Sequence, residues 1–346
     1  MDIQQALARV VEREDLEQDE MGAVMRQIMS GDATDAQIGG LLVALRMKGE
    51  SIAEIAGAAA VMREMATPVK VQGEHLVDLV GTGGDGANLF NVSTAACFVV
   101  AAAGARVAKH GNRSVSSSSG SSDVLEALGV PLDLSPEQVA RSIEEVGIGF
   151  MFAPAHHSAM RHAVGPRREL GLRTLFNMLG PLTNPAGVKR QLLGVFNADL
   201  CEPLAYVLRE LGSEHAMVVH SQDGLDEISI AAPTQVAELK NGEVHCYQID
   251  AASFSLGADS LDGLVVDSAK ASATLIRAAL AGDERAASAQ RIIALNAGAT
   301  IYVAGVAGSL ADGVALAEDL LSTGQAAEKL KSFVDFTQFM RAQNHG

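Results

Sequence analysis

The residues with the clearest chemical potential form a glycine-rich segment, Gly81-Thr82-Gly83-Gly84-Asp85-Gly86. It follows an apolar run at residues 76–80 and precedes Asn91-Val92-Ser93-Thr94 and an alanine-rich helical run. A strand, a glycine turn and a helix start together present backbone N–H groups and a helix dipole to an anion. The glycine spacing fits neither a dinucleotide fingerprint nor a P-loop. We therefore predict a phosphate site here; the alternative is a tight turn that binds no ligand.

A second polar segment has the residue types of an anion cradle. It begins Lys109-His110-Gly111-Asn112-Arg113 and continues as a serine-rich run over residues 114–122. Lys109 would supply a point charge and Arg113 a bidentate fork. A serine run is also typical of a flexible linker. The cradle is favoured because the run lies between an expected strand and an expected helix.

Two further segments carry charged and titratable side chains. Asp223-Gly224-Leu225-Asp226-Glu227 places carboxylates in a loop, where hard oxygen ligands beside a phosphate favour Mg²⁺. A solvated acidic turn is the alternative.

Residues 154–177 hold three histidines and four arginines. These histidines lack the spacing of a zinc site, and each is as well explained by a structural hydrogen bond.

Composition limits the classes of partner. The chain has 346 residues and a net charge of −16, which argues against a nucleic-acid partner but not against a small phosphate. Three widely spaced cysteines suggest a reducing compartment rather than disulfides or zinc. The acidic N-terminus does not resemble a signal peptide, and the longest apolar run is too short to span a bilayer. We expect a soluble cytoplasmic protein.

The elements that must position these residues follow from periodicity. Residues 3–66 are predicted to be helical, with capping boxes at Thr34 and Ser51. From residue 76 onward strands and helices alternate. We predict a hairpin around Asn241-Gly242, a helix over 167–179 and a strand over 300–303. Alternation of this kind predicts an α/β fold with a mostly parallel central sheet flanked by helices. Loops at the carboxyl ends of its strands would then gather the polar segments into one site.

The motifs together resemble a known family. GTGGDG, NVST, KHGNRSVSS, H-x-A-M, RRELGLRTLFNMLGPLTNP and GLDE occur in this order over almost the whole chain, which resembles the anthranilate phosphoribosyltransferases of tryptophan biosynthesis. The resemblance implies transfer of phosphoribose from phosphoribosyl pyrophosphate to the amine of anthranilate, with Mg²⁺ as cofactor. It also implies a small helical domain, residues 1–72 with a returning segment near 166–187, and a large α/β domain, residues 73–346. Homodimers would form through the helical domain.

The resemblance also implies roles for individual residues. The phosphoribosyl pyrophosphate contacts would be Gly81, Gly84, Asp85, Asn91, Val92, Ser93, Thr94, Lys109, His110, Gly111, Asn112, Arg113, Ser114, Val115, Ser116, Ser117 and Ser121. The anthranilate contacts would be Gly81, Asn112 and Arg167, with His110 and His157 along its route. Ser93, Asp226 and Glu227 would hold the metal, and Lys109, Arg167 and Asn112 would be catalytic. The chain departs from the family pattern at Leu89, where many relatives carry a hydroxyl residue.

Three alternative interpretations remain. A pyrimidine nucleoside phosphorylase would share the general fold and the glycine-rich loop, but it is longer and binds a single phosphate. The Asn91–Thr94 segment and the Asp226-Glu227 pair instead favour a diphosphate with metal. A nucleic-acid-binding relative is disfavoured by the net charge. A non-catalytic metabolite-binding subunit would use the same residues, and only turnover would distinguish it.

Overall fold

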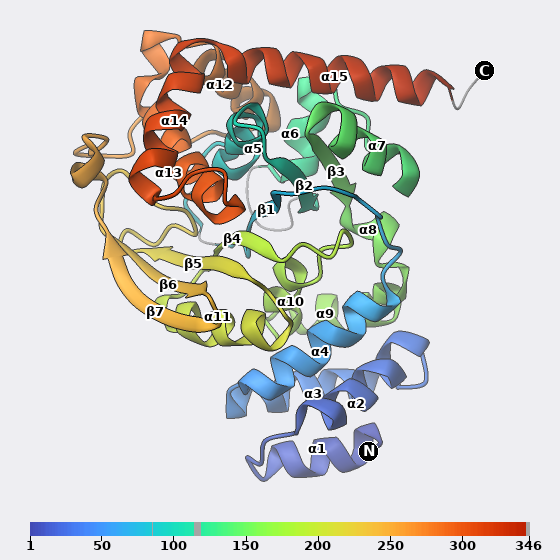
Figure 1. Ribbon diagram of the computed structural model, residues 1–346. Coiled ribbons are helices and arrows are strands. Elements are labelled where there is room, and N and C mark those ends of the chain that lie inside the picture. The colour runs from blue at the N-terminus through green and yellow to red at the C-terminus, as the bar shows by residue number, and fades with distance from the viewer. Residues whose placement is uncertain (85, 114–118, 344–346) are drawn as a thin grey trace.

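The computed structural model describes residues 1–84, 86–113 and 119–343. Its N-terminal helices form a separate bundle beside the sheet (Figure 1). They are α1 (Ile3–Val11), α2 (Gln18–Ser30), α3 (Asp35–Lys48) and α4 (Ile52–Met65). The predicted capping boxes at Thr34 and Ser51 are confirmed, because each side chain accepts a hydrogen bond from the backbone three residues on. Inside the bundle, the buried carboxylate of Glu54 pairs with Lys48 at 3.0 Å.

A seven-stranded sheet organises the rest of the chain. The strands are β1 (Leu76–Gly81), β2 (Arg106–Gly111), β3 (Ile148–Phe152), β4 (Arg190–Gly194), β5 (His215–Ser221), β6 (Thr234–Lys240) and β7 (Glu243–Ile249). Their order is β3-β2-β1-β4-β5-β6-β7, and β1 to β5 are all parallel. β6 and β7 add an antiparallel hairpin whose turn holds Asn241 and Gly242 at positive φ, as predicted. The fold class expected from the sequence is therefore confirmed.

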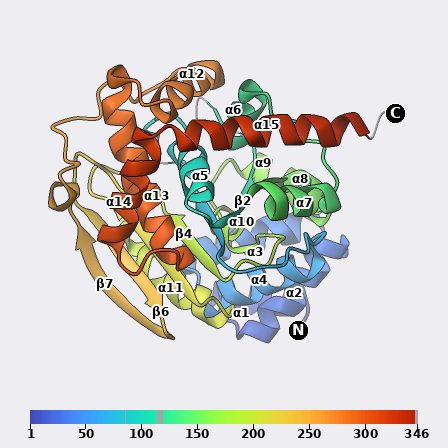
Figure 2. The same cartoon turned by 45° about the horizontal axis from the view of Figure 1, so that its top comes forward.

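Helices cover both faces of this sheet. The longer ones are α5 (Val92–Ala102), α6 (Ser121–Leu128), α7 (Pro136–Val146), α9 (Arg161–Leu170), α11 (Cys201–Glu210), α12 (Ala269–Leu280), α13 (Ala287–Ala304), α14 (Leu310–Ser322) and α15 (Gln325–Gln343). Two shorter ones are α8 (Ala153–His156) and α10 (Phe176–Leu182). Figures 1 and 2 show α13, α14 and α15 on the side of the sheet away from the N-terminal bundle. Their apolar residues share one core with α5 and that face of the sheet.

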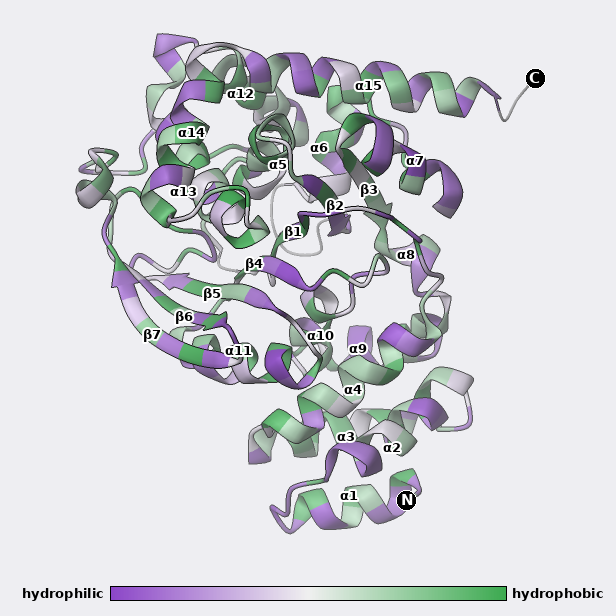
Figure 3. Ribbon diagram, viewed as in Figure 1, coloured by the Kyte–Doolittle hydropathy of each residue, from purple (hydrophilic) through white to green (hydrophobic). Residues whose placement is uncertain are grey.

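The opposite face of the sheet joins a second core. It contains apolar residues of α11, the N-terminal bundle, and the returning segment α9–α10. Leu175, Phe176 and Leu179 belong to this core, so the chain comes back to the bundle after three strands. The outermost strand, β7, is mostly hydrophilic (Figure 3), in line with its exposed residues. No helix in the described part of the chain is long and apolar enough to cross a membrane.

Two expectations about secondary structure were wrong. The predicted strand at 300–303 lies in the last turns of α13. That helix is buried on nearly all sides, so its sequence lacks the 3.6-residue periodicity that distinguishes an exposed helix from a strand. The predicted helix at 167–179 is split into the end of α9 and the start of α10. Gly171, with φ +59°, ends α9 in the left-handed conformation.

Candidate functional site

Three of the predicted polar segments lie in loops at the edge of the sheet where the strand order reverses. β1 is followed along the chain by β2 on one side, whereas β4 lies on its other side. In open parallel sheets a ligand binds beyond the carboxyl ends of the strands at this point. The loops after β1, β2 and β5 carry the glycine-rich, basic and acidic segments to this edge.

The helix start after the glycine loop has no side-chain cap. The side chains of Asp2, Thr34, Ser135 and Ser309 cap their helices. The N-cap residue of α5, Asn91, makes no such bond. Its side chain instead accepts hydrogen bonds from Ser119 Oγ at 2.9 Å and Ser272 Oγ at 2.8 Å.

Thr94 adds a second polar group at the same helix start. Its hydroxyl is buried in the first turn of α5 and has no hydrogen-bond partner among the described residues. Ser93 lies beside it, and Val92 is fully buried against the core. A helix N-terminus that has no side-chain cap and carries an unpaired hydroxyl is suited to phosphate oxygens.

The acidic loop packs directly against the glycine loop. The Gly83 amide donates a 2.7 Å hydrogen bond to Asp226 Oδ2. Any side chain at Gly81 would collide with that same carboxylate, and one at Gly194 would collide with the Asp226 carbonyl. Glycine is therefore required on both strands that flank Asp226.

Lys109, on β2, is buried against β1 and the start of α5 rather than extended into solvent. Only 3% of its surface is exposed, and its Nζ donates to Leu79 O at 2.6 Å and lies 3.4 Å from Ser93 Oγ. The carboxylate of Asp78 is buried nearby, and burial raises its pKa to about 6, although Lys109 acts in the opposite direction. Asn184 donates to Asp78 Oδ2 at 2.7 Å and to Ala108 O at 2.8 Å, which joins the returning segment to β1 and β2.

The described part of the basic segment is held in place by α6. The carbonyl oxygen of Asn112 accepts a hydrogen bond from Ser121 Oγ at 3.4 Å. A side chain at Gly111 would collide with that same hydroxyl. The predicted contacts Asp85, Ser114, Val115, Ser116 and Ser117 lie outside the described residues.

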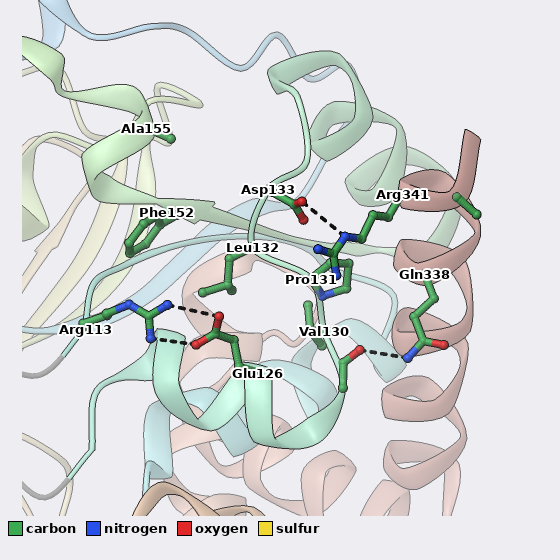
Figure 4. Close-up of a pocket in the computed structure, with 12 residues that line it drawn as sticks. Arg113, Glu126, Val130, Pro131, Leu132, Asp133, Phe152, Ala155, Gln338 and Arg341 are labelled. Carbon is green, nitrogen blue, oxygen red and sulfur yellow. Dashed lines mark hydrogen bonds and ion pairs between the residues drawn. The ribbon is translucent and has the colours of Figure 1, made fainter. Parts of the chain in front are cut away.

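Arg113 is paired with carboxylates of α6. Its guanidinium pairs with Glu126 at 2.6 Å and Asp123 at 2.9 Å, beside a surface groove lined by Leu132 and Phe152 (Figure 4). These carboxylates hold the pKa of Arg113 above its ordinary value. To reach an anion in the cradle, Arg113 would have to exchange both partners for it.

Two histidines form a buried pair on the side of β2 towards α8. The ring centroids of His110 and His157 lie 5.1 Å apart. The Nε2 atom of each ring is buried and has no hydrogen-bond partner within the described structure. Burial lowers the pKa of His110 to about 3 and that of His157 to about 4. Both rings are therefore neutral at pH 7 and offer an unpaired ring nitrogen to a ligand.

Arg167 is a partly buried cation on α9. Its guanidinium lies 5.1 Å from the centre of the Phe176 ring, and burial lowers its pKa from the ordinary value. No carboxylate in the described part of the chain lies within ion-pair distance of it. A partly buried arginine without an ionic partner is suited to a carboxylate-bearing ligand.

The acidic loop suits Mg²⁺ better than a metal held by protein alone. Asp226 and Glu227 supply hard oxygen atoms next to the glycine loop. No group of three or more His, Cys, Asp or Glu side chains arranged for a metal occurs among the described residues. Mg²⁺ commonly takes one or two protein carboxylates and completes its shell with water and phosphate oxygens. The donor set fits that pattern.

Sequence reasoning assigned no role to three residues that organise the site. Asp78 and Asn184 join the strand ends, and Arg173 contacts the glycine loop through Gly84 O. A carboxylate in the apolar run at 76–80 was a usable signal, because such a group is buried only when it is paired. Arg173 lay within the quoted R-T-L-F-N motif, but its contact is 89 residues away in sequence.

Comparisons with known proteins agree with this geometry. Models of the glycosyl transferase family match residues 4–66 (helical bundle domain) and 73–327 (a/b domain). The chain is 68% identical to the anthranilate phosphoribosyltransferase of Teredinibacter turnerae, over 97% of this chain and 99% of the relative. That of Cellvibrio japonicus is 63% identical, over 99% and 100% respectively.

Solved structures show the same relationship. The anthranilate phosphoribosyltransferase of Thermus thermophilus superposes with a TM-score of 0.91 at 44% identity, covering 96% of this chain and 99% of that one. The Saccharomyces cerevisiae enzyme in complex with PRPP and Mg gives a TM-score of 0.87 at 25% identity, covering 97% and 98%. The chain therefore belongs to the glycosyl transferase family and, within it, to the anthranilate phosphoribosyltransferases.

Proposed function

We propose that this protein transfers the phosphoribosyl group of phosphoribosyl pyrophosphate to the amine of anthranilate, with release of pyrophosphate, in tryptophan biosynthesis. The observation that carries the proposal is the uncapped start of α5, where Asn91 makes no capping bond and the buried Thr94 hydroxyl is unpaired within the described structure. It lies beside the glycine loop at the reversal of strand order, where a diphosphate would meet backbone N–H groups and hydroxyls. The relative from Teredinibacter turnerae is named for this reaction, and the structure of the yeast enzyme is a complex with PRPP and Mg.

The diphosphate would lie between the glycine loop and the basic segment. Gly81, Gly84, Ser93 and Thr94 would supply donors from one side, and Lys109, Asn112 and Ser121 from the other. Mg²⁺ held by Asp226, Glu227 and Ser93 would offset the charge that builds up on the leaving pyrophosphate. The buried Lys109 ammonium adds fixed positive charge at the same place.

Anthranilate would enter on the side of α8 and α9. Its carboxylate would pair with Arg167, which has no ionic partner in the described structure. Its ring would lie near the neutral pair His110 and His157, and Asn112 would orient the amine. We assign the anthranilate site to the junction of the helical segment (residues 1–72 and 166–187) and the α/β segment (residues 73–346).

The proposed reaction depends on how the two substrates are positioned, and it needs no nucleophile from the protein. Displacement at the anomeric carbon passes through an oxocarbenium-like state with weak bonds to both groups. Its rate depends on holding the two substrates in line and on stabilising the departing charge. An aromatic amine already exposes a lone pair at pH 7. The site therefore needs no Asp–His pair to activate it.

We further propose a cytoplasmic homodimer that forms through the N-terminal helices. Val11 on α1 and Met47 on α3 are 61% and 72% exposed. A second copy that docked on this bundle would bury such apolar side chains.

The first test is the intrinsic fluorescence of anthranilate in the presence of the protein, phosphoribosyl pyrophosphate and Mg²⁺. The signal should fall with time, and excess chelator should stop the loss. If the folded protein leaves the signal unchanged at saturating substrates, the transferase assignment is wrong. Nucleosides with inorganic phosphate would then test the phosphorylase alternative.

A further inference from the structure

Arg173 contacts the glycine loop, although neither substrate has been assigned to it. It lies between α9 and α10. Its guanidinium donates a hydrogen bond to the carbonyl oxygen of Gly84. The same guanidinium lies 4.3 Å from the centre of the Phe196 ring, just after β4. A planar guanidinium can make both contacts at once, whereas an ammonium group cannot stack in this way.

Phe196 contacts the glycine loop at a second residue, Thr82. Its N–H donates to Thr82 Oγ1 at 3.1 Å, and the Thr82 N–H donates to Gly194 O at 2.9 Å. Arg173 and Phe196 therefore hold the loop at Gly84 and Thr82 and also pack against each other. Gly84 has φ +81°, and a Cβ atom there would lie 3.0 Å from the Arg173 guanidinium.

Arg173 is also bound from the N-terminal bundle. The guanidinium of Arg46, on α3, donates to the carbonyl oxygen of Arg173. The backbone of Arg173 therefore contacts the helical bundle, and its side chain contacts the glycine loop. The two contacts span 127 and 89 residues of sequence.

We propose that Arg173 is a positioning residue that sets the glycine loop for the diphosphate and couples that loop to the helical bundle. The guanidinium engages the Gly84 carbonyl oxygen, which would repel a diphosphate if it turned towards the phosphate site. Without Arg173, only a fraction of the molecules would hold the loop in the binding conformation, and the apparent affinity would fall by that fraction. The inference rests on the proposed function for the identity of the diphosphate.

The experiment compares Arg173→Ala and Arg173→Lys with the wild type in steady-state kinetics. The KM for phosphoribosyl pyrophosphate should rise about tenfold, as expected for the loss of one hydrogen bond from a charged donor. The kcat and the KM for anthranilate should stay within about twofold. Arg173→Lys keeps the charge but loses the fork and the stacking, so it should behave like Arg173→Ala. Arg209→Ala is the matched control, because Arg209 stacks on Tyr206 at 4.8 Å on the exposed side of α11.

A double-mutant cycle tests the coupling to the bundle. Arg46→Ala should raise the same KM by a smaller factor, and it should have no further effect in the Arg173→Ala background. Additive effects would overturn the coupling. An unchanged KM in Arg173→Ala, or full activity in Arg173→Lys, would overturn the positioning role, the latter because charge alone would then suffice.

Calorimetry of phosphoribosyl pyrophosphate binding tests the positioning role of Arg173 independently of the proposed transferase activity. Wild type that binds the diphosphate without turning over anthranilate would refute the proposed transferase. The tenfold difference in affinity between wild type and Arg173→Ala would still test Arg173. Equal affinities would refute the inference alone, and wild type that binds no diphosphate would refute both.

Discussion

The Gly83 amide and the Asp226 carboxylate, 143 residues apart in sequence, are joined by a hydrogen bond of 2.7 Å. This bond makes the glycine loop and the acidic loop one unit. The proposed diphosphate-binding backbone and the proposed metal-binding carboxylates are therefore positioned by the same contact. A change that breaks this bond should affect both ligands.

The acidic pair can be tested by removing charge while keeping shape. In Asp226→Asn/Glu227→Gln, the amide oxygen of the new side chain at position 226 can still accept the hydrogen bond from Gly83. The metal would nevertheless lose its two anionic ligands. We expect Mg²⁺-dependent turnover to fall by about two orders of magnitude or more. Turnover should be measured over a range of Mg²⁺ concentrations.

Asp223→Asn is the control for this pair. Asp223 belongs to the same loop, but its carboxylate accepts a 2.6 Å hydrogen bond from Ser229 Oγ. It should retain the Mg²⁺ dependence of the wild type. Near-normal turnover in the Asp226/Glu227 double variant would remove these residues from the metal site.

Lys109 should be a stabilising residue as well as a functional one. Lys109→Met would leave Asp78 buried without the cation that favours its charged form. It would also leave the buried Leu79 carbonyl oxygen without the hydrogen bond from Lys109 Nζ, and the loss of such a partner costs about 1–3 kcal/mol. Adding Asp78→Asn, which removes the remaining charge, should restore part of that loss. Urea unfolding of the single and double variants measures both effects, and a double variant no more stable than Lys109→Met would refute the coupling.

Arg167 should govern affinity for the acceptor only. Arg167→Ala should raise the anthranilate KM about 10- to 100-fold, since a hydrogen bond to a charged group contributes about 1.5–3 kcal/mol. The KM for phosphoribosyl pyrophosphate should stay within about twofold. Arg161→Ala, at an exposed position on the same helix, is the control. Equal rises in both KM values would contradict the assigned role.

The sequence predicted the parts of the fold that depend on local rules. The capping boxes at Thr34 and Ser51 and the Asn241-Gly242 turn depend on residues within a few positions of one another, and all three are present. The gathering of polar loops at one edge also followed, because parallel strands place their carboxyl ends together. The strand predicted at 300–303 failed because a fully buried helix has no polar face to reveal its period.

Side-chain contacts between different elements were beyond such rules. Arg113 has the residue type and position of an anion ligand, yet its guanidinium pairs with Asp123 and Glu126 on the following helix. The partners of Asp78 and Arg173 lie 106 and 89 residues away. Such contacts are set by tertiary packing, which neither composition nor periodicity encodes.

The buried pair His110 and His157 should make stability depend on pH in a defined direction. The folded-state pKa values, about 3 and about 4, lie below the ordinary value of 6.5. Between these limits the unfolded chain binds protons that the folded chain excludes. The free energy of unfolding therefore has its full value, as far as these two rings are concerned, above pH 6.5. It decreases as the pH falls from 6.5 towards 4. Each group contributes a slope of about 1.4 kcal/mol per pH unit over this window.

Chemical unfolding of wild type and His157→Asn between pH 7.5 and 4 measures this slope. The variant lacks one excluded proton, so any stability that it loses relative to wild type at pH 7.5 should shrink as the pH is lowered. His245→Asn, at an exposed position on β7, is the control for replacing a surface imidazole by an amide. A constant or widening gap for His157→Asn would mean that the ring is protonated in the folded protein, and the neutral pair proposed to face anthranilate would be wrong.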